Sequence, residues 1–228
     1  MKIVFLHAFP LDERMWEAQG SAFSENVDIP NLYRLGRSMD EWAESVLAET
    51  EGSFVACGAS MGGYSALAIA RVAPERLEGL VLAGARVDAD SDERRAARAK
   101  TIELIRSEGA AGLWEDMRPK LFADTASEEV VERARRIALE QDPDTLVTAV
   151  EAIRDRLDST DAFAALDVPV LVAAGEHDPF LSVDEARTAA EAARDGRLQV
   201  FEGCGHLPSI ERPDEFNRVL AAFREKAG

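Results

Sequence analysis

The sequence is poor in basic residues. Lysine and arginine number 26 against 43 aspartates and glutamates, which gives a formal net charge of −17 at pH 7 over 228 residues. Because nucleic acids and anionic membrane surfaces are bound through basic patches, this balance argues against both as partners. A chain of this length can form one good hydrophobic core with a small lid, but hardly two independent domains.

Cysteines and long apolar runs are also scarce. The two cysteines, Cys57 and Cys204, have no metal-ligand or C-x-x-C spacing, and no dinucleotide fingerprint is visible, so we expect no metal and no cofactor. A disulfide is left open, but free thiols in a reducing cytoplasm fit better. The first apolar run, residues 3–6, is too short for a signal peptide, and no run approaches the roughly 18 residues of a membrane helix. We therefore predict a soluble, cytoplasmic protein and leave its oligomeric state open.

One pentapeptide organises the rest of the chain. Residues 58–62, Gly-Ala-Ser-Met-Gly, stand between an apolar run at 54–57 and a helical pattern at 64–71. A serine between a strand and a helix has its hydroxyl pushed out at the end of the sheet, on a strained turn that neighbouring glycines make possible. The Gly-x-Ser-x-Gly pattern by itself is weak evidence for a nucleophile. Its position between a strand and a helix favours Ser60 as a nucleophile over a serine without a chemical role in a glycine-rich turn.

Apolar runs and helical periodicities alternate along both ends of the chain. Buried parallel strands are predicted at 3–6, 27–32, 54–57, 77–83, 168–174 and 198–201. Between them, helices are predicted at 12–23, 38–49, 64–71, 182–195 and 214–226. The pattern indicates an α/β fold with a doubly wound, mostly or wholly parallel six-stranded sheet.

The middle of the chain lacks strands. Helices are predicted near 91–107, 110–121, 127–139 and 144–156, without a clear strand between 88 and 167. We interpret residues 1–87 and 168–228 as the core and residues 88–167 as an inserted helical cap over the edge of the sheet. An independent helical domain is the alternative, and the insertion is short for one.

Three histidines compete for the role of general base. A base must reach the serine hydroxyl and be oriented by an acid at its other nitrogen. His206 follows the last strand in a flexible, glycine-flanked loop, and it is favoured; a buried structural role is the alternative. His7 follows the first strand and is expected to hold that loop, whereas His177 is expected to be partly exposed.

Asp178 is the favoured acid, because Ser60, Asp178 and His206 then follow the chain order of one hydrolase architecture. It precedes Pro179, so a turn aspartate is the alternative. Asp88 and Glu176 are weaker rivals.

An oxyanion hole needs two backbone N–H donors. One is expected from Met61, the residue after the nucleophile, and the other from the loop after the first strand, most plausibly from Phe9. The sequence leaves open whether the ring of Phe9 lines the pocket or belongs to the hydrophobic core.

Four stretches together resemble the α/β-hydrolase superfamily, in particular its small esterase and enol-lactonase-like branch with a helical cap. They are 6–12 (Leu-His-Ala-Phe-Pro-Leu-Asp) with Met-Trp at 15–16, 58–63, 175–178 (Gly-Glu-His-Asp), and 203–208 with Glu-Arg-Pro at 211–213. The resemblance implies a Ser60 nucleophile, a His206 base, an Asp178 acid, and Phe9 and Met61 as oxyanion donors.

The chain departs from that family in three places. Ala8 replaces a glycine, which requires a φ that is negative or only mildly strained. Asn31 begins the stretch where an aspartate is usual, at a position that serves structure. The usual N-terminal antiparallel hairpin has no counterpart, which predicts a sheet without it.

These observations predict a serine hydrolase that acts on a small carboxylic ester through an acyl-enzyme. Enol-lactone or other lactone hydrolysis is the main alternative, and thioester or peracid chemistry stays open. Other classes are a non-catalytic small-ligand-binding protein and a lyase on the same fold. Arg86 is a candidate to meet a substrate carboxylate, although a surface salt bridge is favoured. Three cap residues are expected to form cap core more readily than pocket wall: Trp114, Met117 and Phe122.

Overall fold

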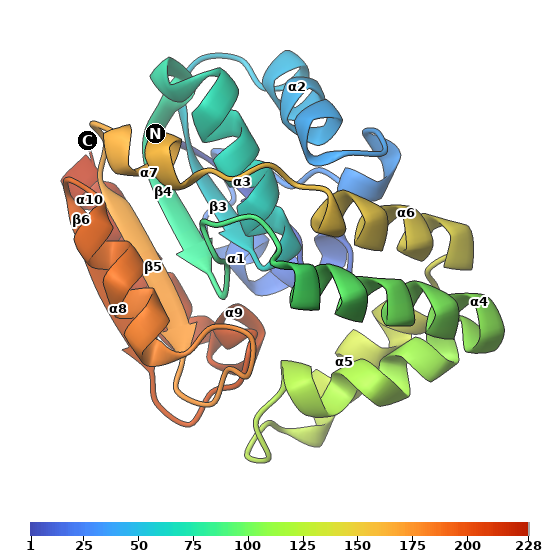
Figure 1. Ribbon diagram of the computed structural model, residues 1–228. Helices are drawn as coiled ribbons and strands as arrows, with labels where there is room; N and C mark the ends of the chain where they lie inside the picture. The colour runs from blue at the N-terminus through green and yellow to red at the C-terminus, as the bar shows by residue number, and fades with distance from the viewer. Residues whose placement is uncertain (228) are drawn as a thin grey trace.

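The computed structural model describes residues 1–227 and contains a six-stranded sheet in the order β2-β1-β3-β4-β5-β6. Every neighbouring pair is parallel, so the prediction of an open, wholly parallel α/β sheet is confirmed (Figure 1). The strands are β1 (Lys2–Leu6), β2 (Val27–Asp28), β3 (Phe54–Ala59), β4 (Leu77–Ala83), β5 (Val170–Gly175) and β6 (Gly196–Phe201).

Helices cover both faces of this sheet. One face packs against α2 (Met39–Glu49), α3 (Met61–Val72) and α8 (Val183–Ala192). The other face packs against η1 (Glu13–Trp16), α9 (Pro208–Glu211) and α10 (Pro213–Ala227), with α1 (Glu17–Ala22) beside α10. Alternate residues of the buried strands point to opposite sides, so Val4 and Leu6 enter one core cluster and Ile3 and Phe5 the other.

The second strand is much shorter than predicted. The sequence suggested a strand over 27–32, but β2 ends at Asp28 and a 3₁₀-helix, η2 (Leu32–Arg34), follows. Pro30 has no N–H to offer a neighbouring strand. The side chain of Asn31 accepts a hydrogen bond from the Tyr33 N–H at 3.0 Å, which caps η2 instead of extending the sheet.

The secondary-structure elements within residues 88–167 are all helices, as predicted. They are α4 (Asp92–Leu121), α5 (Glu128–Leu139), α6 (Pro143–Arg154) and α7 (Thr160–Ala165). The predicted break between the first two helices falls at Gly109, whose φ of 67° interrupts α4. Figure 1 shows α4, α5 and α6 grouped together, with α7 apart from them near α3 and β4. The division of the chain into a core and a cap at residues 88 and 167 stays a prediction.

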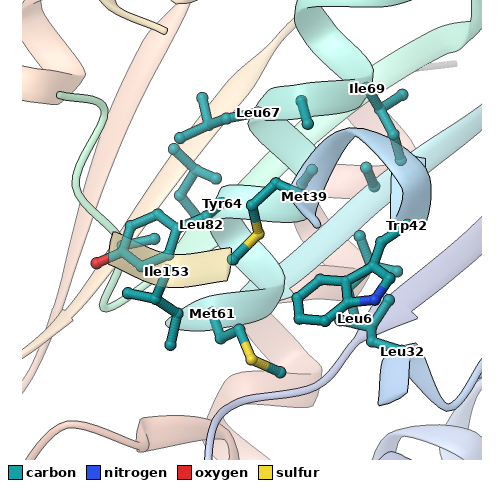
Figure 2. Close-up of a cluster of buried hydrophobic side chains, with 14 of the residues drawn as sticks. Leu6, Leu32, Met39, Trp42, Met61, Tyr64, Leu67, Ile69, Leu82 and Ile153 are labelled. Atoms are coloured by element: carbon teal, nitrogen blue, oxygen red, sulfur yellow. The ribbon is translucent and has the colours of Figure 1, made fainter. Parts of the chain in front are cut away.

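The helices of this insertion share a core with the sheet. Leu146 and Ile153 of α6 belong to the same buried cluster as Met61 of α3. Figure 2 shows Ile153 beside Tyr64, at the start of α3. The beginning of α3 therefore lies between the sheet and the inserted helices. Within residues 1–227, no helix has both the length and the apolar character that a membrane crossing needs.

Candidate active site

Ser60 occupies a strained turn between β3 and α3. Its φ of 49° and ψ of −112° make it the one non-glycine residue with a positive φ among the described residues. The turn is held because the Ser60 N–H donates to the Ala83 carbonyl at 2.8 Å and the Ser60 carbonyl accepts from the Gly63 N–H at 2.9 Å. Strain of this kind persists where the surrounding structure enforces it, often at functional sites.

The glycines on either side of Ser60 are required by close packing. A Cβ on Gly58 would lie 2.3 Å from the Gly62 carbonyl oxygen, and a Cβ on Gly62 would lie 2.0 Å from the Leu6 carbonyl oxygen. The first clash is the expected one between strand and returning helix. The second is with the neighbouring strand β1, so Gly62 also allows the first loop to approach the serine.

His206 and Asp178 form a buried hydrogen-bonded pair. The His206 Nδ1 lies 2.8 Å from the Asp178 Oδ2, and both side chains are almost fully buried. The other oxygen of Asp178, Oδ1, accepts from the N–H groups of Phe180 at 2.8 Å and Leu181 at 3.3 Å. A carboxylate only accepts hydrogen bonds, so the neutral form of His206 carries its proton on Nδ1 and has Nε2 as its acceptor.

The rival acids and bases lie in other environments. Asp88 pairs with Arg86 and Arg94, and Glu176 accepts from the Gly203 N–H at 2.9 Å. The side chain of His177 is 59% exposed, 3.8 Å from that glutamate.

His7 is buried with both nitrogens occupied. Its Nε2 accepts from the Leu32 N–H at 3.0 Å, and its Nδ1 lies 3.3 Å from the Ala8 carbonyl oxygen. Burial lowers the pKa of His7 to about 4, so it is neutral at pH 7. It therefore holds the loop after β1, and Ala8 in that loop has no positive φ.

The loop that carries His206 is held in place by the end of α4. The His206 N–H donates to the Leu121 carbonyl at 3.0 Å. The carboxylate of Glu211 accepts from the Gly205 N–H at 2.9 Å and from the Ala123 N–H at 3.0 Å. The sequence suggested a flexible loop because of its glycines, but these contacts fix it.

A small cavity brings Ser60 and His206 together. Its volume is about 30 Å³, and its wall consists of Phe9, Ser60, Tyr64, Arg98, Met117, Ile153, Phe180 and His206. Within the described residues the Ser60 hydroxyl has no hydrogen-bond partner, and the ring of Phe180 packs edge-on against His206 with 4.7 Å between centroids. Nucleophile–base contacts are commonly long before substrate binds. The larger surface clefts lie elsewhere and contain neither Ser60 nor His206.

Phe9, in the cavity wall, and Met61, which follows Ser60 in the chain, are the two predicted N–H donors. Phe9 and Met61 are 5% and 0% exposed, and the N–H of neither donates a hydrogen bond to another described residue. Unpaired buried N–H groups are rare in proteins. Met61 opens α3, whose N-terminal end also favours negative charge. Their role as the two donors of an oxyanion hole stays a prediction.

The remaining sequence candidates divide between the cavity and the core. Of the three residues predicted for the cap, Met117 lines the cavity, whereas Trp114 and Phe122 are buried with their ring centroids 6.2 Å apart. Arg86 pairs with Asp88 at 2.9 Å and Glu185 at 2.7 Å, as in the favoured salt-bridge interpretation.

Both cysteines are buried and free. No cluster of His, Cys, Asp and Glu within residues 1–227 is arranged to hold a metal ion.

Sequence reasoning missed Arg98 in the cavity wall and the clamp formed by Glu211. Arg98 lies in a long, charge-rich helix where no local motif distinguishes it. Glu211 lies in the Glu-Arg-Pro motif at 211–213, but no local signal in the sequence predicted its hydrogen bonds with Gly205 and Ala123.

Comparisons with known proteins agree with this architecture. The family model described as "Alpha/beta hydrolase family" matches residues 3–219. The pimeloyl-[acyl-carrier protein] methyl ester esterase of Aromatoleum aromaticum is 27% identical, with 93% of this chain and 94% of that protein covered. The 3-oxoadipate enol-lactonase 1 of Acinetobacter baylyi is 21% identical, with 97% and 87% covered.

Solved structures resemble the whole chain. A thermophilic esterase from Thermogutta terrifontis, determined with malate bound, has a TM-score of 0.93 and 31% identity, and the match covers 100% of this chain and 90% of that one. The enol-lactonase from Burkholderia xenovorans LB400 has a TM-score of 0.84 at 24% identity, with 98% and 90% covered, and shares the fold.

Proposed function

Because the chain belongs to the alpha/beta hydrolase family, we propose that it is a serine esterase that cleaves small carboxylic esters. Ser60 is the nucleophile, His206 the general base and Asp178 the residue that orients it. The observation that supports this most is the shared cavity. It combines a serine on a strained turn with a histidine whose free Nε2 faces away from its carboxylate partner.

In the proposed mechanism, His206 Nε2 takes the proton of the Ser60 hydroxyl as the oxygen attacks the ester carbonyl carbon. The tetrahedral oxyanion accepts hydrogen bonds from the N–H groups of Phe9 and Met61. As the carbon–oxygen bond to the alcohol breaks, His206 gives its proton to the leaving alcohol, and an acyl-enzyme remains. Water, deprotonated by His206, then attacks the acyl carbon. As the bond between that carbon and the Ser60 oxygen breaks, His206 returns the proton to Ser60, and the acid is released.

Lactone hydrolysis is the second candidate. The same machinery attacks a cyclic ester, and two similar proteins are 3-oxoadipate enol-lactonases of Acinetobacter baylyi. The esterase of Thermogutta terrifontis, which is 31% identical over the whole chain, favours an open-chain ester as the first substrate to test.

The direct test is hydrolysis of p-nitrophenyl acetate by the wild type and by Ser60→Ala. Removing a triad nucleophile lowers catalysis by a factor of about 10⁴ or more, so we expect kcat/KM to fall to near background. Ser65→Ala is the matched control, because Ser65 lies one turn further along α3 with a buried hydroxyl that has no partner. Unchanged hydrolysis in Ser60→Ala would falsify the proposal.

A fluorophosphonate probe separates an esterase from a non-catalytic binding protein. An activated serine forms a covalent adduct, so we expect labelling at Ser60 and none in Ser60→Ala. An absent adduct in the folded wild type favours the binding protein.

A further inference from the structure

The wall of the candidate active site holds one permanently charged side chain. Phe9, Tyr64, Met117, Ile153 and Phe180 contribute mainly apolar or aromatic surface, and Ser60 and His206 contribute the chemistry. Arg98 is the remaining residue of the wall. A guanidinium next to apolar side chains is costly unless a partner of opposite charge satisfies it.

Arg98 is one of three arginines that share a single carboxylate. Asp90 has a fully buried side chain, and its oxygens lie 2.6 Å from Arg156 Nη1, 3.1 Å from Arg98 Nε and 3.4 Å from Arg94 Nε. Arg94 also pairs with Asp88, which itself pairs with Arg86. With Glu185, the second partner of Arg86, three carboxylates face four arginines, so the cluster has one positive charge in excess, in a chain whose net charge is −17.

The three arginines differ in how many donors they have used. Arg156 donates to Asp90, to the Ile153 carbonyl and to the Asp88 carbonyl, and its guanidinium lies 4.1 Å from the centroid of the Tyr64 ring. Arg98 donates only from Nε, to Asp90. Its Nη1 and Nη2 groups donate to no other residue that the structure describes, and 26% of the side chain is exposed.

The bond to Asp90 also orients Arg98. A guanidinium that is fixed through Nε presents its two terminal nitrogens as a planar fork, which matches the two oxygens of a carboxylate. Arg98 lines the same cavity as Ser60 and His206, so this fork is available to an anionic group on a molecule bound there.

We propose that Arg98 binds a carboxylate of the substrate, so that the preferred substrates are esters or lactones that carry a second, ionised carboxyl group. This inference rests on the proposed function of Ser60. Arg86, the candidate that the sequence suggested for this role, is already paired with two carboxylates. Arg98 is a specificity residue and takes no part in the bond-breaking step.

The test compares monomethyl succinate with dimethyl succinate, two esters of similar shape that differ by one negative charge. We expect the wild type to prefer the anionic ester. A charge-assisted bidentate contact predicts that Arg98→Gln lowers kcat/KM for monomethyl succinate about 10- to 100-fold more than for dimethyl succinate. Arg98→Lys keeps the charge without the fork and is expected to lie between the two.

A second pair, acetoxyacetate and its methyl ester, places the carboxylate on the alcohol side instead of the acyl side. Arg98→Gln is expected to act selectively on the anionic member of at least one of the two pairs. Arg95→Gln is the matched control, because Arg95 lies on the same helix, pairs with Asp155 at 2.9 Å and is not in the cavity wall. Turnover of the neutral esters reports that each variant is folded.

Calorimetry can measure the binding of succinate to Ser60→Ala without catalysis. It therefore tests the role of Arg98 separately from the esterase role of Ser60. We expect the double variant Ser60→Ala, Arg98→Gln to bind succinate at least tenfold more weakly. Equal loss for anionic and neutral esters, or unchanged binding of succinate, rejects the role of Arg98 and leaves the esterase proposal standing. Ester hydrolysis that survives Ser60→Ala rejects the esterase proposal, whereas the succinate measurement still decides whether Arg98 binds a carboxylate.

Discussion

His7 is a titratable side chain that the structure keeps neutral. Both of its nitrogens lie against backbone groups, of Leu32 and Ala8, and its ring packs edge-on against Tyr33 with 4.7 Å between centroids. Burial holds its pKa near 4, below the ordinary value of 6.5. Protonation would place an unpaired charge in the core and release the Leu32 N–H, so this residue makes the loop after β1 sensitive to acid.

The free energy of unfolding should therefore fall as pH is lowered. Between pH 6.5 and 4 the unfolded chain binds a proton at His7 that the folded chain does not, so stability present above pH 6.5 is lost on acidification. From pH 7 to pH 5 this contributes about 2 kcal/mol, at about 1.4 kcal/mol per pH unit below 6.5.

Urea unfolding at both pH values measures this loss. His7→Asn is expected to lose less stability than the wild type over this interval, whatever its stability at pH 7. His177→Asn removes an exposed imidazole and should retain the wild-type dependence. Identical pH dependence in the wild type and His7→Asn contradicts the assignment.

Helix α9 is a single turn that connects the loop carrying His206 with the residues just after α4. Its last residue, Glu211, accepts hydrogen bonds from the loop that carries His206 and from Ala123, just after α4. Burial raises the pKa of this carboxyl, since its charged form has left water. The position of the proposed base therefore depends on a contact between the inserted helices and the C-terminal part of the chain.

Replacing Glu211 with glutamine should weaken both stability and activity. An amide has one acceptor oxygen, so one of the two N–H groups loses its partner, which costs about 1–3 kcal/mol of unfolding free energy. We expect kcat/KM to fall as well, because the His206 loop is less well held. Urea unfolding and p-nitrophenyl acetate hydrolysis measure the two effects. Asp214→Asn, in the first turn of α10, is the control, and a destabilised Glu211→Gln with unchanged kcat/KM argues against positioning.

At the scale of the whole molecule, the candidate active site lies between the sheet and the inserted helices, and its cavity is small. Its cavity of about 30 Å³ has room for roughly one water molecule. An ester is larger, so side chains of the wall must move when it binds. Met117 of α4 has an unbranched, flexible side chain, which makes it the wall residue best able to do so.

Shortening Met117 should widen the range of esters accepted. We expect Met117→Ala to raise the ratio of kcat/KM for p-nitrophenyl hexanoate over p-nitrophenyl acetate about 3- to 10-fold, because a pocket distinguishes chain lengths by the space it offers. The acetate rate in the same protein is the internal control for folding and for the chemistry. An unchanged ratio means that the acyl chain lies elsewhere.

Local patterns were sufficient for most of the fold. Continuous apolar runs predicted the buried strands, and β4 coincides with the predicted range of 77–83. Ser38 and Ser127 accept hydrogen bonds from the N–H groups three residues later and begin helices where expected. The predicted length of the second strand was wrong, because Pro30 and the capping residue Asn31 follow soon after Asp28 and the chain turns into a 3₁₀-helix there.

The residues proposed for the site were also predicted from local signals. Ser60 lies between a strand and a helix, and Asp178 and His206 follow two neighbouring strands whose carboxyl ends meet at one edge of the sheet. The hydrogen bond between those two side chains is the contact that such an arrangement allows.

The amino-acid sequence alone therefore determined the positions of most strands, the turn at Ser60 and the family. These features depend on residues that are neighbours in the chain or that follow parallel strands. Tertiary structure alone decided that Arg98 lines the cavity, that Glu211 holds the His206 loop and that the cavity is small. Those features arise where the inserted helices pack on the sheet. Which side chains meet there depends on the packing of surfaces that are distant in sequence, and no local pattern encodes it.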